Sequence, residues 1–200
     1  MRGLILKDLY VMKQNFKSYF IIATGFLAIG CASTADFYLV FLPLLFCSMI
    51  PIVLLRIDET SKWLKYSATM PYTKGQIVSE KYLIGLGALA IMLFIILIAQ
   101  VLQNHISNIF ILMVLLIGLS LFASSLVFPF MFGFGYEKAS WIYIICIICS
   151  RKIISPNWLS DEILTEIKLN GFLPIICFVG VGVFALSWYL SILFYKRREM

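Results

Sequence analysis

Long runs of uncharged residues alternate with short charged segments along the chain. Five uncharged intervals contain 18, 19, 23, 31 and 27 residues, and in order they begin after Lys17, Asp36, Lys81, His105 and Lys168. A helix needs about 20 apolar residues to cross the hydrocarbon core of a bilayer. Because that core offers the backbone no hydrogen-bond partners, spans are helices or closed barrels, and barrels alternate apolar and polar residues. The continuous runs therefore predict an all-α integral membrane protein.

A sixth, weaker candidate span covers residues 139–155. It has 12 uncharged residues before Arg151, which alone is typical of an interfacial or re-entrant segment. If the helix continues to Pro156, Arg151 and Lys152 can extend to the headgroups, and the segment is then long enough to span. A sixth span is also favoured because an even number of spans keeps both charged termini on one side of the membrane. We therefore expect one transmembrane domain, 1–200, of six helices, and complete crossing by 139–155 stays open. The expected spans are 18–35, 37–55, 82–104, 107–129, 139–155 and 171–195.

The basic residues give the orientation. Of 16 Lys and Arg residues, four precede the first span, five lie in 56–81, one is Lys138 and three lie in 196–198, which places thirteen on one side. Cytoplasmic loops carry such an excess of Lys and Arg. Both termini and the loop 56–81 are thus expected in the cytoplasm, and 156–170 forms an extracellular loop.

Composition narrows the chemistry. The chain is 62% hydrophobic and 13% charged, with a net charge of +6, whereas soluble domains are about half apolar and a quarter charged. The five cysteines lie in apolar stretches, and a zinc site needs four ligands converging in a polar shell, so we expect packing roles and no metal. There is one histidine and no GxxxxGK[ST] loop to hold phosphates. We expect no cofactor bound by this chain, no catalytic residues and no nucleic-acid partner.

Residues 1–17 have the pattern of a basic amphipathic helix. The residues at helical spacing on its apolar face are Ile5, Leu9, Met12 and Phe16. Such a helix lies in the inner headgroup plane, in contact with membrane lipid. The alternative is a charged segment that only fixes the topology.

The cytoplasmic loop 56–81 carries two helix patterns. The run 58–61 is a helix start, and a short helix is expected over 61–69, where Trp63, Tyr66 and Met70 form an aromatic-rich stripe. This stripe is suited to receiving another protein, or alternatively to anchoring in the headgroups. Thr73 and Gln76 have the spacing of a capping box, so the next helix is expected to start at Thr73.

The chain resembles the compact bacterial permease subunits of type-2 ATP-binding-cassette exporters. The resemblance rests on residues 1–10, on 129–139, and on 58–82 with Trp63, Tyr66, Met70, Pro71 and Lys74. It implies a bacterial plasma-membrane permease that dimerises with itself or a related permease. ATP and Mg would be bound by separate ATPase subunits. The chain departs from the family pattern in the short fifth span, which ends in Arg151 and Lys152.

The resemblance also implies roles for particular segments. The loop after the second span would be the coupling helix, with Asp58, Glu59, Trp63, Tyr66 and Met70 entering a groove on the ATPase, and residues 1–17 would be the elbow helix. The few charges in the spans suit a hydrophobic or amphipathic cargo, such as a peptide toxin, an antimicrobial peptide or a lipid-like molecule. The competing hypotheses are a non-transporting scaffold or sensor and a membrane enzyme.

Overall fold

The fold consists of helices throughout the part of the chain that the computed structural model describes, which confirms the predicted all-α class. This part comprises residues 2–15, 17–32, 37–67, 69, 72–102, 109–153 and 172–197. Its helices are α1 (Arg2–Asn15), α2 (Lys17–Ala32), α3 (Phe37–Ser48), α4 (Ile50–Thr60), α5 (Trp63–Ser67), α6 (Lys74–Leu102), α7 (Ile109–Phe134), α8 (Tyr136–Ile153) and α10 (Phe172–Arg197).

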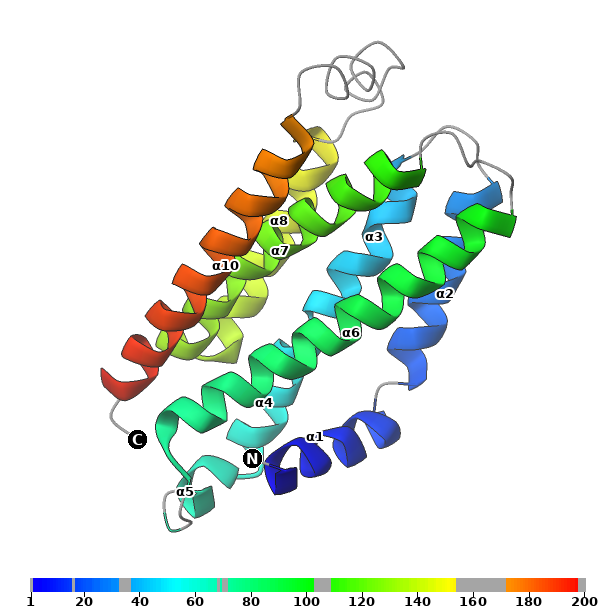
Figure 1. The fold of residues 1–200 in the computed structure, drawn as a ribbon. Coiled ribbons are helices and arrows are strands. Elements are labelled where there is room, and N and C mark those ends of the chain that lie inside the picture. The colour runs from blue at the N-terminus through cyan, green and yellow to red at the C-terminus, as the bar shows by residue number, and fades with distance from the viewer. Residues whose placement is uncertain are drawn as a thin grey trace.

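The long helices lie side by side in a bundle, and α1 lies across one end of it (Figure 1). The short helix α5 and both chain termini lie at this same end. The Lys74 ammonium at the start of α6 donates a hydrogen bond to the Lys196 carbonyl near the end of α10, at 3.4 Å. We call this end the foot of the bundle.

Four described helical stretches are long and apolar enough to cross a membrane: Tyr38–Thr60, Lys74–Leu102, Met113–Phe134 and Phe178–Arg197. The stretch Tyr19–Gly30 in α2 is apolar but shorter. α8 has 18 residues and carries charged residues near both ends. The predicted total of six spans therefore depends on α2 and α8.

The second predicted span, 37–55, continues five residues farther, to Thr60. It consists of α3 and α4, which are separated by a turn at Met49, and Pro51 occupies the first turn of α4. A proline is tolerated there because the first N–H groups of a helix have no intrahelical partner. The expected outer loop 156–170 lies outside the described residues.

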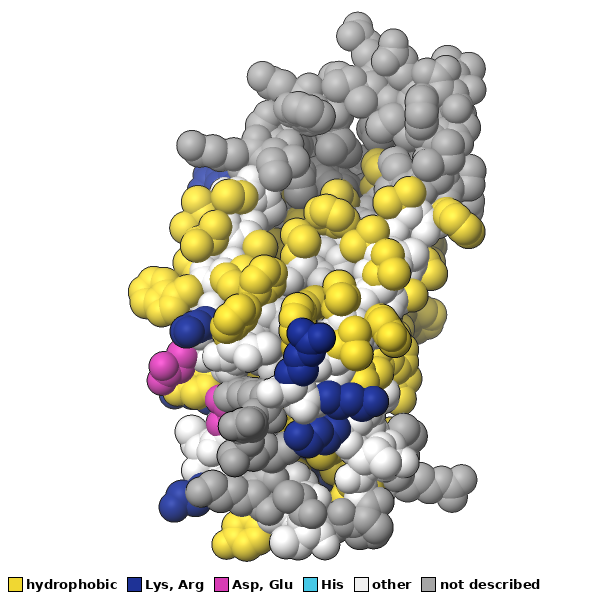
Figure 2. All heavy atoms as spheres, turned by 90° about the vertical axis from the view of Figure 1, so that its left-hand side faces the viewer, with side chains coloured by type: hydrophobic (Ala, Val, Ile, Leu, Met, Phe, Trp, Pro, Cys, Tyr) yellow, Lys and Arg dark blue, Asp and Glu magenta, His cyan; other side chains and the backbone are white. Residues whose placement is uncertain are grey.

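Large apolar side chains cover much of the outside of the bundle. Phe94, Trp141 and Phe178 are 64%, 69% and 83% exposed. On the face in Figure 2, hydrophobic side chains fill the middle, and most of the visible charged side chains lie below them, toward the foot. An apolar surface this extensive is unusual on a soluble monomer and suits contact with lipid.

Candidate functional site

The junction between α4 and α5 forms a projecting corner at the foot. α4 ends with hydrogen bonds from the Ser61 and Lys62 N–H groups to the carbonyls of Ile57 and Glu59, at 2.9 and 3.3 Å. Lys62 has a φ of 56°, in the left-handed region that breaks a right-handed helix. α5 therefore begins at Trp63 and ends at Ser67, so the helix expected over 61–69 is shorter than predicted.

The predicted capping box at the start of α6 is confirmed. The Gln76 N–H donates to Thr73 Oγ1 at 3.3 Å, and the Thr73 N–H donates to Gln76 Oε1 at 3.1 Å. The Thr73 N–H thus finds a side-chain acceptor, and the Gln76 N–H has one in addition to the Thr73 carbonyl at 3.0 Å. The box fixes where the chain leaves the corner and enters the third long helix.

Five charged side chains meet beneath this corner, and we call them the charge cluster: Lys7 and Asp8 from α1, Asp58 from α4, and Glu80 and Lys81 from α6. The Lys81 ammonium lies 2.5 Å from Asp8 Oδ2 and 2.6 Å from Asp58 Oδ2. The Lys7 ammonium lies 2.9 Å from Asp8 Oδ1 and 2.6 Å from Asp58 Oδ1. The cluster therefore ties α1 to α4 and α6.

Four of the five members of the cluster are buried, and the Lys7 side chain is 23% exposed. The exposed fractions of Asp8, Lys81 and Glu80 are 1%, 1% and 2%. Buried charges persist when each has an opposite charge and hydrogen bonds. For Asp8, burial raises the pKa, but Lys81 and Lys7 more than offset this and hold the pKa below its ordinary value, so Asp8 is ionised.

Lys7 also connects the cluster to α5. Its ammonium lies 4.6 Å from the centroid of the Trp63 ring, in the range of a cation–π contact. Trp63 is half-buried, whereas Tyr66, one turn along the same short helix, is 64% exposed. At the foot, α5 is therefore held on its inner side through Trp63, and it exposes Tyr66 on its outer side.

The structure separates the five predicted coupling residues. Tyr66 is exposed, Glu59 and Trp63 are half-buried, Asp58 is buried in ion pairs, and Met70 lies outside the described residues. The burial of Asp58 could not be predicted from the sequence, because its partners Lys7 and Lys81 are 51 and 23 residues away along the chain.

The predicted apolar face of α1 differs from the face that packs on the bundle. Leu4 and Asp8 are buried, Ile5 and Met12 are half-buried, and Leu9 is 51% exposed. The fourth member of the predicted face, Phe16, lies outside the described residues. The predicted face was expected to contact lipid, so the two faces serve different contacts, and the packed face includes Asp8 in its ion pair with Lys81.

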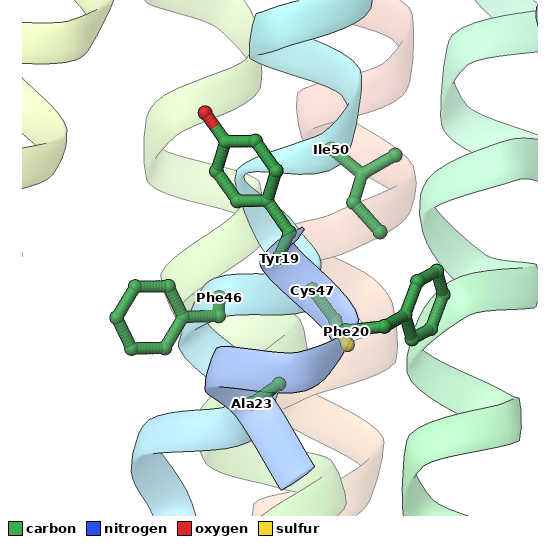
Figure 3. A pocket seen from close by; sticks show the side chains of 6 residues that line it. All are labelled: Tyr19, Phe20, Ala23, Phe46, Cys47 and Ile50. Atoms are coloured by element: carbon green, nitrogen blue, oxygen red, sulfur yellow. The ribbon is translucent and has the colours of Figure 1, made fainter. Parts of the chain in front are cut away.

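A shallow hollow of about 10 Å³, comparable to one water molecule, lies between α2 and the α3–α4 junction (Figure 3). Its lining residues are Tyr19, Phe20, Ala23, Phe46, Cys47 and Ile50. No three His, Cys, Asp or Glu side chains in the described ranges are placed to hold a metal ion.

Comparison with known proteins gives one finding that covers nearly the whole chain. A family model described as ABC-2 family transporter protein matches residues 3–196. The searches of curated proteins and of solved structures returned no match. The matched range includes α5 and the entire charge cluster.

Proposed function

The chain belongs to the ABC-2 family of transporter proteins and is a permease subunit, and from this premise we propose that α5 is the docking element for a separate ATPase. The observation that carries the proposal is the exposed Tyr66 on a short helix whose base is held by the charge cluster. A docking element must present a side chain and resist being pushed aside. Tyr66 meets the first need, and the ion pairs of Asp58 meet the second.

The proposal assigns different tasks to the predicted coupling residues. Tyr66 contacts the ATPase directly, and Glu59 contacts it from the last turn of α4. Asp58 and Trp63 position α5 from below, through Lys81 and Lys7. Met70 keeps its expected place in the ATPase groove.

We further propose that the permease has six spans with both termini in the cytoplasm of a bacterium, and that two copies, or one copy and a related permease, bind two ATPase subunits. ATP and Mg are bound by those subunits. Their closure on ATP pushes the two α5 helices and rocks the halves of the dimer. A mechanical cycle of this kind requires contacts that differ between two states.

The proposed cargo is a hydrophobic or amphipathic molecule that enters from the membrane, such as a peptide toxin, an antimicrobial peptide or a lipid-like molecule. The scarcity of charged residues in the expected spans favours this class. If the chain is instead a scaffold or sensor, α5 should make the same contact with its partner, but no cargo should be transported. Transport of a fluorescent amphipathic peptide by vesicles containing permease and ATPase distinguishes the two.

The docking proposal is tested by replacing Tyr66 with alanine and measuring how much ATPase co-purifies. Truncating an aromatic anchor at the centre of an interface typically costs at least about 2 kcal/mol, or roughly a 30-fold loss of affinity. The matched control is Tyr189→Ala on α10, because Tyr189 is 63% exposed, against 64% for Tyr66. Undiminished co-purification of the Tyr66→Ala protein would contradict the docking role.

A further inference from the structure

The charge cluster contains three carboxyl groups but two ammonium groups. Lys7 and Lys81 each lie within 2.9 Å of both Asp8 and Asp58, so these four charges cancel. Glu80 is the fifth member and is 2% exposed. An ionised Glu80 would leave the cluster with one uncompensated negative charge away from water, which is strongly unfavourable.

The surroundings of Glu80 indicate how this charge is avoided. Glu80 Oε1 is buried and receives no hydrogen bond from a described donor. Asp8 Oδ1 is also buried and receives no hydrogen bond from a described donor, although the Lys7 ammonium lies 2.9 Å away as an ion-pair partner. The carboxyl groups of Glu80 and Asp8 lie close enough to interact with each other. Two carboxylates have four acceptor oxygens and no donor, so a hydrogen bond between them requires a proton.

We propose that the charge cluster is a proton-binding site, in which Glu80 carries one proton and donates it in a hydrogen bond to Asp8. Asp8 is the acceptor because Lys7 and Lys81 stabilise its ionised form. The charged groups that act on Glu80 are Lys81 on its own helix and Lys7 and Asp8 on α1, with Asp58 of α4 paired to the same lysines. With the proton bound, the cluster is neutral.

Loss of the proton to water turns the contact between Glu80 and Asp8 from attraction into repulsion. Among the described side chains of α1, Asp8 and Leu4 are the buried ones, so this repulsion loosens α1 from α6. Lys7 links the same region to Trp63, and the change therefore reaches α5. The site makes the attachment of α1 sensitive to proton concentration, whether or not an ATPase is present.

The test is thermal unfolding of the purified full-length protein in detergent, from mildly acidic through neutral to mildly alkaline pH. An unfolded chain releases the Glu80 proton above about pH 4.3, the ordinary pKa, whereas the folded cluster keeps it. The folded state then binds one more proton than the unfolded state, so stability falls as pH rises until the cluster also releases its proton. For one proton, Tm should fall by roughly 3–5 °C per pH unit over this interval.

The Glu80→Gln protein should lose this part of the slope, because its amide donates to Asp8 at every pH. The control is Glu137→Gln on α8, an exposed carboxylate whose removal should leave the wild-type slope. Equal slopes for wild type and Glu80→Gln would overturn the proposal. If Glu80→Gln does not fold, infrared spectroscopy of the wild type decides: a protonated-carboxyl band that disappears on raising the pH supports the site, and its absence at neutral pH refutes it. Neither measurement involves an ATPase, so a failed docking experiment leaves this result unaffected.

Discussion

Gly85 lies where α6 passes α4 and α7 at close range. A Cβ atom at this position would be 3.0 Å from Pro51 Cγ and 3.1 Å from Phe128 Cζ, both shorter than ordinary van der Waals contact. The proline ring is rigid, and Phe128 is held by edge contacts with the Tyr82 and Phe184 rings. The absence of a side chain at Gly85 therefore sets how closely three helices approach.

Replacing Gly85 with alanine is expected to destabilise the protein by about 1–3 kcal/mol, the usual effect of overpacking a core. Gly87 provides the comparison, since a Cβ there meets nothing within 4 Å. Gly87→Ala should be neutral or stabilising by up to about 1 kcal/mol, because alanine favours helix. Thermal unfolding of both proteins in one detergent measures the difference, and equal effects would show that Gly85 is not a tight contact.

The burial of the charged side chains in the cluster could not be predicted from the sequence. Asp8, Asp58 and Lys81 lie in segments whose charge predicts a cytoplasmic surface, and charged residues are rarely buried unless paired. Their pairing depends on α1 folding back across the foot, which brings together residues 73 positions apart. The position of Trp63 and Tyr66 on one short helix, by contrast, was predictable, because helical spacing is a local pattern.

Among the elements, the long helices were predictable because charges interrupt the apolar runs at the places where spans end. The start of α6 was predictable because a capping box involves residues three apart. The packed face of α1 was not predictable from periodicity, since the ion pair of Asp8 decides it. The length of α5 was also missed, because a non-glycine residue in the left-handed region, Lys62, has no clear sequence sign.

The capping box predicts a coupled effect of two substitutions at the start of α6. Thr73→Ala removes the side-chain acceptor of the Gln76 N–H, which keeps its bond to the Thr73 carbonyl, and should destabilise the protein by about 1 kcal/mol. Gln76→Ala removes the acceptor for the Thr73 N–H and should have a smaller effect. Because the two bonds form one unit, the double variant should lose less than the sum of the single variants. Strict additivity in unfolding measurements would mean that the two side chains act independently.

The distribution of Lys and Arg predicted that both charged ends of the chain lie on one side of the membrane. In the structure, α1, α5 and the end of α10 all lie at the foot of the bundle. The number of spans was harder to predict because α8 carries charges close to both ends. Its 18 residues extend about 27 Å at 1.5 Å per residue, slightly less than a hydrocarbon core of about 30 Å. Arg151 is exposed in the last turn of α8, where its long side chain can reach the headgroups.

Complete crossing by α8 has a consequence for the far end of the chain, because each span reverses the side of everything that follows. With six spans and a cytoplasmic start, a green fluorescent protein fused after Met200 should fluoresce, since it folds in the cytoplasm. Alkaline phosphatase fused after residue 160 should be active, since it requires the outside. If α8 does not cross, both results reverse: the phosphatase is inactive and the fluorescent fusion is dark. Control fusions after Thr69, in the predicted cytoplasmic loop, should fluoresce and lack phosphatase activity in either case, so the pair of reporters measures α8 alone.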